Sequence, residues 1–401
     1  MTDNALHGEN WRTCFALLPK VSRTFALSIA LLKPPMRHAV CLGYLLCRLV
    51  DTFEDAETLS TPQKAAFIRD LQTFLSGQTQ PAPDWVREAV VALGAGVSPS
   101  DKELLLNLDA VLAAYESLPE HDRQSVDRCV QEMAIGMIEM QALLDQRGAE
   151  ASPSDGTGVN GSAPAGAEAL GARRLRLLPT MESLTRYCHY VAGIVGTLLT
   201  ELLFLNSEAV TKGRYFDLLQ RSETFGQYLQ KINILKDIPG DHAKGWCFIP
   251  QAAVQAAGLT PEGLLSGDGA RRVGAIAPVM RDVLNHLALA WQYVTLVPLK
   301  EREYRLFLGY SFFFGVATVV LGLKEPDRSF EGDRPLKIGR LDVAAIIARV
   351  NAAIDDPQAL RAYLHGWLQD ARAGLDPRWP AGVAEALNGL LRTLEPAVAA
   401  R

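Results

Sequence analysis

The block Asp51-Thr-Phe-Glu54-Asp55 brings three carboxylates together on a stretch that reads as helix. With about 100° between successive helical residues, one stripe about 60° wide holds Tyr44, Arg48, Asp51 and Asp55. Carboxylates at positions i and i+4 lie one turn apart and can share a cation. Mg²⁺ prefers oxygen ligands and commonly bridges one or two carboxylates to substrate phosphates. Taken alone, the block is explained more simply by a solvated helix face, with Arg48 in an ordinary salt bridge.

A second polar stripe lies in the range Gln230–Asp241, where Gln230, Asn233 and Asp237 share one face of a predicted helix. Asp241 lies four residues after Asp237 and, if the helix continues, would add a second carboxylate to this face. Pro239 stands between the two aspartates, removes one helical hydrogen bond and leaves open whether Asp241 lies directly beneath Asp237. A helix that ends at a Pro-Gly stop is the alternative interpretation.

Together the two clusters favour a metal-assisted reaction of a diphosphate. Facing helices with inward acidic stripes could hold Mg²⁺ ions that neutralise a diphosphate and help it leave. An allylic carbocation would remain, and it needs a dry pocket without good nucleophiles. An apolar helix bundle can supply such a pocket.

The rest of the chain predicts the bundle that must position these clusters. Apolar residues recur at helical spacing in 67–75, 104–115, 126–144, 184–205 and 225–236, and no convincing strand pattern appears. Segment 148–172, rich in Gly, Ala, Ser and Pro, predicts a flexible surface insertion. We expect one all-α domain spanning residues 1–401, because the chemistry on both sides of the insertion must converge.

Composition narrows the class of protein. The net charge of −5 argues against nucleic-acid binding, and 48% hydrophobic residues in 401 exclude wholesale disorder. The six cysteines form no C-x-x-C pair, which indicates free thiols in a reducing compartment. The uncharged range 306–323 is near the lower length limit of a membrane span, and we interpret it as a buried core helix.

Five ordered blocks resemble the squalene/phytoene synthase family, and most closely its squalene synthase branch. They cover roughly residues 18–345, apart from the insertion. The blocks are Val21–Phe25, Asp51–Asp55, Tyr187–Gly196 (YCHYVAGIVG), Gln230–Asp241 and Phe330–Arg340 (FEGDRPLKIGR). The resemblance implies the all-α isoprenoid synthase fold, a helical bundle around a central cavity. It also implies that two farnesyl diphosphates join head to head through presqualene diphosphate, and that NADPH then reduces this to squalene.

The resemblance also assigns roles to individual residues. The implied Mg²⁺ ligands or their close support are Asp51, Glu54, Asp55, Asn233, Asp237 and Asp241. The implied diphosphate-binding residues are Ser22, Arg23, Arg48 and Gln230. Tyr187, and with it Tyr44, would stabilise the cation or steer proton removal from the pocket wall, although a core tyrosine is the plain alternative.

The NADPH assignment depends on a C-terminal segment at about 305–345, where Lys337 and Arg340 could hold a nucleotide phosphate. There the chain departs from the eukaryotic pattern: Gly339 replaces an arginine, and Ser311-Phe312 replaces a Pro-Gln pair. An enzyme that stops at presqualene diphosphate, or makes dehydrosqualene, hydroxysqualene or phytoene without reduction, is therefore the nearest alternative. A non-catalytic helical binding or scaffold protein is the alternative from another class.

From the terminal residues we expect neither a signal peptide nor the C-terminal anchor of eukaryotic relatives. We therefore expect a bacterial-type enzyme in the cytoplasm, with peripheral association at the membrane as an alternative. The sequence leaves the oligomeric state open.

Overall fold

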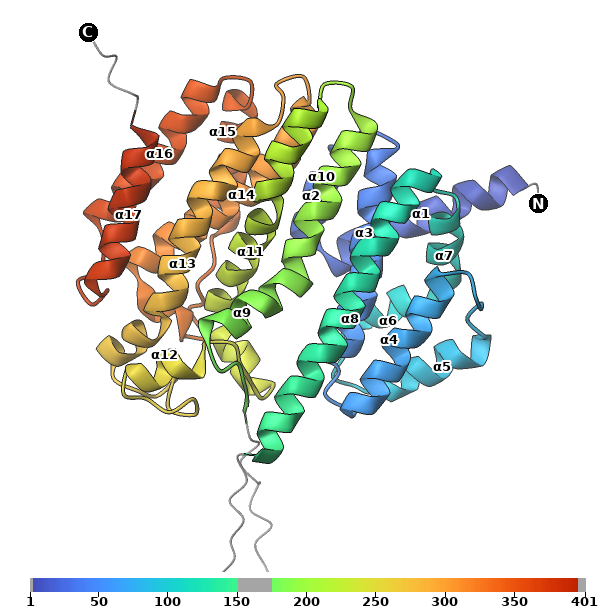
Figure 1. Cartoon of the computed structure of the whole chain (residues 1–401), viewed down its shortest axis with the longest axis horizontal. Helices are drawn as coiled ribbons and strands as arrows, with labels where there is room; N and C mark the ends of the chain where they lie inside the picture. Colours follow the sequence, from blue (N-terminus) through green and yellow to red (C-terminus); the bar gives the residue numbers. More distant parts are fainter. Residues whose placement is uncertain (1–2, 151–174, 396–401) are drawn as a thin grey trace, which may run out of the picture.

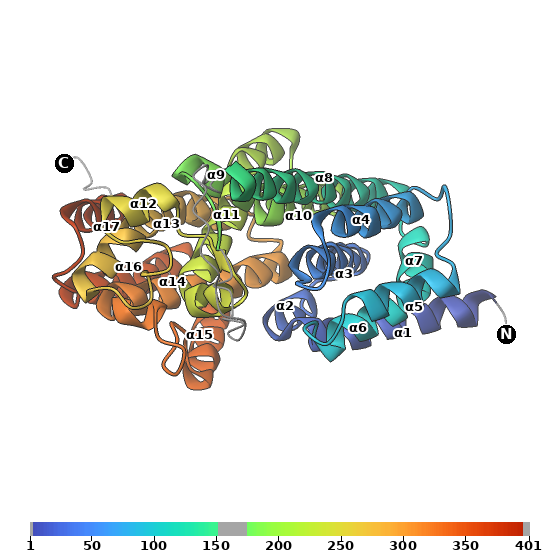
Figure 2. The ribbon, with the colours of Figure 1, turned by 90° about the horizontal axis from the view of Figure 1, so that it is seen from below.

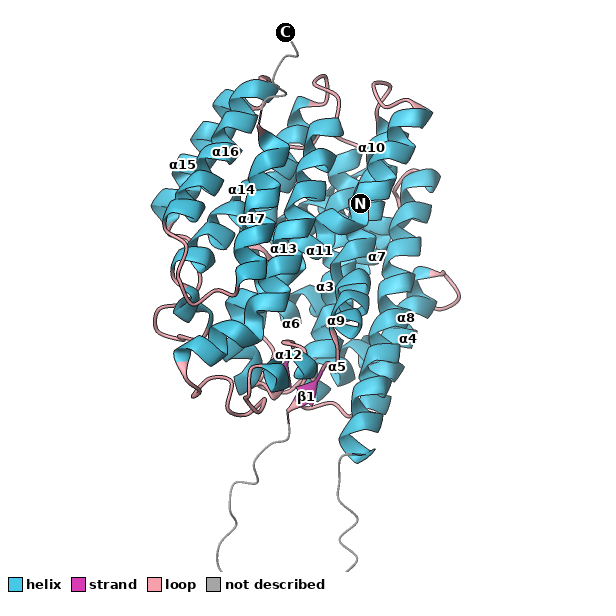
Figure 3. Cartoon of the chain, turned by 60° about the vertical axis from the view of Figure 1, so that its left-hand side comes forward, coloured by secondary structure: helices cyan, strands magenta, loops and turns pink. Residues whose placement is uncertain are grey.

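The computed structural model describes the backbone of residues 3–150 and 175–395, and the side chains of these except 3–7, 23, 24 and 145–150. Most of these residues lie in helices (Figure 3), and the strands among them are two residues long, which confirms the all-α prediction. Most of the predicted insertion 148–172 lies outside the described residues. Its first three residues, 148–150, continue the preceding helix.

The first half of the bundle contains α1 (Asp3–Val21), α2 (Arg23–Ile29), α3 (Met36–Asp55), α4 (Thr61–Leu75), α5 (Pro83–Ala92), α6 (Pro99–Leu106), α7 (Leu108–Glu116) and α8 (Glu120–Glu150). The second half contains β1 (Arg176–Leu177), α9 (Met181–Cys188), the π-helical segment η1 (His189–Gly193), α10 (Ile194–Asn206), α11 (Lys212–Ala243), β2 (Trp246–Cys247), α12 (Gln251–Ala256), α13 (Gly269–Leu296), α14 (Arg302–Lys324), the 3₁₀ helix η2 (Pro326–Ser329), α15 (Arg340–Ala353), α16 (Pro357–Ala373) and α17 (Ala381–Leu394).

The helices follow the chain from one side of the molecule to the other. In Figure 1, α1 and α4–α7 lie on one side, α12–α17 on the other, and α8–α11 run between them. Viewed from below, α3 lies inside a group formed by α1, α4, α6 and α8 (Figure 2), and it contacts all four. Because α3 carries the first carboxylate block, its buried position places that block inside the molecule.

Helix α11 carries the second carboxylate block and answers the question that Pro239 raised. Its first turn is capped by the Thr211 hydroxyl, which accepts a hydrogen bond from the Arg214 amide, and the helix continues through Pro239 to Ala243. Asp241 therefore lies one turn beyond Asp237 on the same helix. Packing of α11 against its neighbours outweighs the hydrogen bond that proline removes.

The predicted helix 184–205 is interrupted by the π-helical segment η1. This segment lies very close to α11. A Cβ on Gly226 of α11 would lie 2.0 Å from the carbonyl oxygen of Ala192 in η1. A Cβ on Gly196 would lie 1.9 Å from the carbonyl oxygen of Ser222. The small residues of this face thus serve helix packing, while Ala192 and Gly196 also border a cavity described below.

Helix α14 contains the uncharged range 306–323 and lies in the core. Within the part of the chain that the structure describes, two helical stretches, Met181–Asn206 and Arg302–Lys324, are long and apolar enough to span a membrane, but 89% of the most apolar window of the second is buried inside the structure. Its Arg305 is 1% exposed and donates hydrogen bonds to the carbonyl oxygens of Val297 and Ile354. This agrees with the interpretation of 306–323 as a core helix.

Candidate active site

Two adjoining cavities lie between α3 and α11. The larger, with a volume of about 470 Å³, is called here the polar cavity. It is lined by Arg48, Asp51, Glu54, Asp55, Met137, Tyr187, Val191, Gln230, Asn233, Ile234, Lys236, Asp237, Gly240, Asp241, Lys244, Trp246 and Phe248. The two acid-bearing blocks, distant in sequence, therefore face one chamber.

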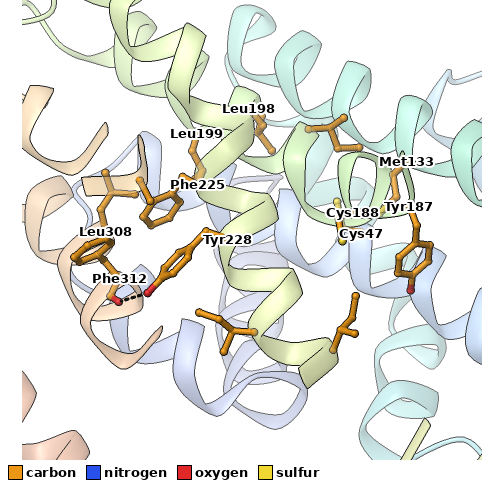
Figure 4. Packing of buried hydrophobic residues seen from close by; sticks show 14 of the residues in the cluster. Cys47, Met133, Tyr187, Cys188, Leu198, Leu199, Phe225, Tyr228, Leu308 and Phe312 are labelled. Atoms are coloured by element: carbon orange, nitrogen blue, oxygen red, sulfur yellow. Dashed lines mark hydrogen bonds between the residues drawn. The ribbon is translucent and has the colours of Figure 1, made fainter. Parts of the chain in front are cut away.

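The smaller cavity, of about 220 Å³, is called here the apolar hollow. Most of its wall is hydrophobic, including Phe25, Met133, Leu199, Phe225 and Phe307. The hollow shares Arg48, Asp51, Val191, Gln230 and Asn233 with the polar cavity. Figure 4 shows Phe225 on α11 near Leu199, with Met133 and Tyr187 farther along. A molecule with a charged head and a greasy tail could occupy both spaces at once.

Burial changes the acidity of the first carboxylate block. Burial, and next the charge of Asp55, raise the pKa of Asp51 to about 7. Burial and the same neighbour raise the pKa of Glu54 to about 8. Crowding of like charges in a poorly solvated site indicates a place for a cation.

Glu54 is held more tightly than its two neighbours. It is 4% exposed, and its Oε1 accepts a hydrogen bond from Nε2 of Gln141 at 2.5 Å. The ammonium group of Lys64, also buried, donates to the backbone carbonyl of Glu54. Glu54 therefore serves at least as support for the end of α3, whereas Asp55 is exposed to the cavity.

The second block shows the same electrostatic pattern. Burial, and next the charge of Asp237, raise the pKa of Asp241 to about 7. Asp237 and Asn233 are exposed. Lys236 donates to Oδ1 of Asn233 at 3.0 Å, and its Nζ lies 3.3 Å from Oδ2 of Asp237. Such a half-exposed ion pair is weak enough to be exchanged for another cation.

The donor set fits Mg²⁺ bound together with a diphosphate. Among residues 3–150 and 175–395, no three histidine, cysteine, aspartate or glutamate side chains form a ready-made metal site. The acids instead line one cavity from two helices. This arrangement suits Mg²⁺, because that ion keeps several waters and takes further oxygens from substrate phosphates.

An aromatic wall closes one side of the polar cavity. The ring of Phe248 stacks with that of Tyr187 at a centroid distance of 4.7 Å and with that of Trp246 at 5.3 Å. The guanidinium group of Arg176 lies 4.9 Å from the Trp246 ring. Burial and the nearby first block hold the pKa of Tyr187 well above its ordinary value, so its hydroxyl stays protonated.

Arg48 is the cation shared by both cavities. Its Nε and Nη2 donate to Oδ1 and Oδ2 of Asp101 on α6, both at 2.8 Å. This pair raises the pKa of Arg48 above its ordinary value. Arg48 thus has the position predicted from the sequence, together with a partner that the sequence did not indicate.

The other predicted residues lie in three different settings. Tyr44 lines the apolar hollow, and burial raises its pKa although it hydrogen-bonds Ser22. The Ser22 hydroxyl also accepts from the amide of Phe25 and so caps α2. The Arg23 side chain lies outside the described residues. Lys337 and Arg340 are exposed and border neither cavity.

Several residues of this site were missed by sequence reasoning, namely Lys64, Asp101, Gln141, Lys244, Trp246 and Phe248. Trp246 and Phe248 stand where they do because β2 pairs in parallel with β1. The hydrophobic run Trp246–Ile249, which follows the acidic end of the predicted helix, is the sequence signal that could have indicated them.

Comparison with known proteins gives a consistent result. The family model for squalene/phytoene synthase matches residues 18–320. Squalene synthase of Eremothecium gossypii is 28% identical over 325 residues, which cover 80% of this chain and 64% of that protein. Squalene synthase of Schizosaccharomyces pombe is 28% identical, covering 80% of this chain and 61% of that protein. The chain thus spans less than two thirds of the length of these relatives.

The fold comparison agrees with the family match. The solved complex of TcSQS with the ligand BPH1237 superimposes with a TM-score of 0.76 at 22% identity, covering 96% of this chain and 99% of that one. This likeness confirms the fold, a helical bundle shared with isoprenoid synthases. With the family model covering most of the chain, this protein belongs to the squalene/phytoene synthase family.

Proposed function

We propose that this chain is a Mg²⁺-dependent prenyltransferase that joins two farnesyl diphosphates head to head, through presqualene diphosphate, and forms squalene with NADPH. The observation that carries the proposal is the shared polar cavity. Asp51 of α3 and Asp237 of α11 face the same chamber, and that chamber adjoins an apolar hollow.

Diphosphate binding is the task of the polar cavity. Mg²⁺ held by Asp51, Asp55, Asp237 and Asp241, with Glu54 and Asn233 as support, would neutralise the diphosphate and make it a better leaving group. Arg48 and Gln230 line both cavities, and the place where these adjoin is called here the neck. The planar guanidinium group of Arg48 offers hydrogen-bond donors to phosphate oxygens there. The prenyl tail would then extend into the apolar hollow.

Control of the carbocation is the task of the aromatic wall and the hollow. An aromatic face attracts a cation without forming a bond to it. Tyr187 and Phe248 line the cavity where the diphosphate would leave. Because Tyr187 stays protonated, its hydroxyl is a poor nucleophile there, and the hydrophobic hollow keeps water from the cation.

The reductive step is the finer part of the proposal. The named relatives are squalene synthases. Segment Phe330–Arg340 resembles the corresponding segment of that branch, except at Gly339. Lys337 and Arg340 are accessible cations that would hold a nucleotide phosphate. They border neither cavity, so a nucleotide held there would have to reach the chamber from outside it.

Incubation of the purified chain with farnesyl diphosphate tests the proposal. Released pyrophosphate and extracted lipids are measured with Mg²⁺ or EDTA, and with or without NADPH. We expect Mg²⁺-dependent pyrophosphate release and squalene only when NADPH is present. The same hydrocarbon or alcohol with and without NADPH would overturn the reductive half and favour the non-reductive alternatives. Absence of Mg²⁺-dependent pyrophosphate release would favour a non-catalytic binding protein.

We further propose one domain for the whole chain, in the cytoplasm or peripheral at a membrane. Support for one domain comes from the two acidic blocks, which lie on opposite sides of segment 151–174 and line one cavity. Fractionation of cells that express the chain, with and without a salt wash, tests the location.

A further inference from the structure

Asp101 has an unusual setting for a charged residue outside every recognised block. It lies in the first turn of α6 and is only 4% exposed. Its carboxylate binds Arg48 through two parallel hydrogen bonds of 2.8 Å. Bidentate arginine–carboxylate pairs are both strong and directional, so this one fixes the orientation of the guanidinium plane.

A second contact fixes Asp101 itself. The Ser98 hydroxyl donates to Oδ2 of Asp101 at 2.7 Å, and the backbone amide of Asp101 donates to Oγ of Ser98 at 3.1 Å. Ser98 caps α6, so the carboxylate is anchored to the start of a helix that packs against α3. The Arg48 side chain is therefore held from outside the helix that carries it.

Arg48 stands between two carboxylates. Asp101 binds the edge formed by Nε and Nη2, while Asp51, three residues after Arg48 on α3, lines the same two cavities as Arg48. An arginine has five N–H donors, and the pair uses two of them. The Nη1 side of the guanidinium is not part of this pair, and Arg48 borders both cavities.

We propose that Asp101 is a positioning residue that holds Arg48 at the neck between the cavities, turned to receive a diphosphate and kept away from Asp51. This inference rests on the proposed function, because it assigns the diphosphate to Arg48. Asp101 itself borders neither cavity and acts through Arg48. Without Asp101, Arg48 would pair with Asp51 and occupy a carboxylate needed for the cation.

Binding of farnesyl thiodiphosphate, a prenyl diphosphate with a poor leaving group, tests the inference without turnover. Calorimetry with Mg²⁺ is carried out on the wild type and on Asp101→Asn, Arg48→Met and the double variant. We expect Asp101→Asn to weaken binding about tenfold. In the double variant it should add almost nothing to Arg48→Met, because coupled residues are not additive.

The same helix provides a matched control. Glu103 of α6 pairs with Lys20 at 2.6 Å, and both side chains are nearly half exposed. Glu103→Gln also removes one negative charge from α6 and should leave binding unchanged. Ser98→Ala keeps the ion pair but loosens Asp101, so a smaller loss, about two- to threefold, is expected even if Asp101→Asn folds poorly.

The outcomes separate this inference from the function beneath it. A wild type that does not bind the analogue with Mg²⁺ overturns the proposed function and this inference with it. A wild type that binds, with losses from Asp101→Asn and Arg48→Met that simply add, overturns the positioning role alone. Equal losses in Asp101→Asn and Glu103→Gln would do the same.

Discussion

The rings of Tyr187 and Phe248 stack with their centroids 4.7 Å apart, although one residue lies in the last turn of α9 and the other follows β2. Both rings line the polar cavity beside the first carboxylate block. The stack places two aromatic rings at the chamber where, under the proposed function, a carbocation would form. Stabilisation of that cation would then depend on two segments that are distant in the sequence.

Replacement of Phe248 tests this aromatic wall. Phe248→Leu keeps a hydrophobic side chain but removes the aromatic face, so kcat for pyrophosphate release should fall about tenfold while KM changes little. Phe216→Leu on the exposed surface of α11 is the matched control and should have no effect. Equal kcat values in wild type and Phe248→Leu would show that the wall does not stabilise the cation.

Replacement of the central aspartates tests the two acidic blocks separately. Asp51→Asn or Asp237→Asn should each lower Mg²⁺-dependent pyrophosphate release by a factor on the order of 100 or more, because each replaces a negatively charged carboxylate that would bind Mg²⁺ with a neutral amide. The control is Asp109→Asn on α7, where the side chain is exposed. If either variant retained full activity, the corresponding block would not belong to the active site.

The raised pKa values of three carboxyl groups predict a pH dependence of stability in the metal-free protein. The pKa values of Asp51 and Asp241 are about 7, and that of Glu54 about 8, against ordinary values of 3.8, 3.8 and 4.5. At these three groups the folded chain therefore binds more protons than the unfolded chain between these limits, and they make the folded state less stable as pH rises. Its stability should fall as pH rises from about 4 to about 8.

Thermal unfolding with EDTA across this range measures the effect, and Asp51→Asn should flatten the slope. Mg²⁺ with pyrophosphate should raise Tm more at about pH 8 than at about pH 6, since ionised carboxylates bind the cation. If Tm in EDTA does not fall with rising pH, or Asp51→Asn leaves the slope unchanged, the acidic groups are not buried as described.

The close contact of η1 with α11 predicts a steric limit. Gly226→Ala would place a Cβ 2.0 Å from the carbonyl oxygen of Ala192, so the two backbones must separate at a cost of about 1–3 kcal/mol. Gly213→Ala on the same helix meets nothing within 4 Å and should be neutral or slightly stabilising. Urea unfolding of both variants provides the comparison, and equal stability would refute the close approach.

The sequence was informative where spacing along one helix determines the outcome. Asp51 and Asp55 share a stripe because they are four residues apart, and the polar cavity does contain both. The relative position of Asp237 and Asp241 could not be predicted in the same way, because local helix propensity alone does not show whether the helix continues through Pro239. The packing around α11 decided that question.

The residues missed from the sequence are those whose role depends on distant partners. Asp101 is 53 residues away from Arg48, and nothing in its local sequence distinguishes it from an ordinary helix-capping segment. Phe248 depends on a two-residue strand pair that is too short to produce an alternating pattern. Contacts of this kind follow from tertiary structure rather than from periodicity.

The central claim is that both acidic helices hold metal and diphosphate in one chamber. Anomalous diffraction from crystals grown with Mn²⁺ and farnesyl thiodiphosphate measures this directly, because Mn²⁺ replaces Mg²⁺ at oxygen sites. We expect manganese peaks between the carboxylates of Asp51 and Asp55 and those of Asp237 and Asp241, with the prenyl tail in the apolar hollow. Manganese bound at only one helix, or a diphosphate located outside the polar cavity, would contradict the account.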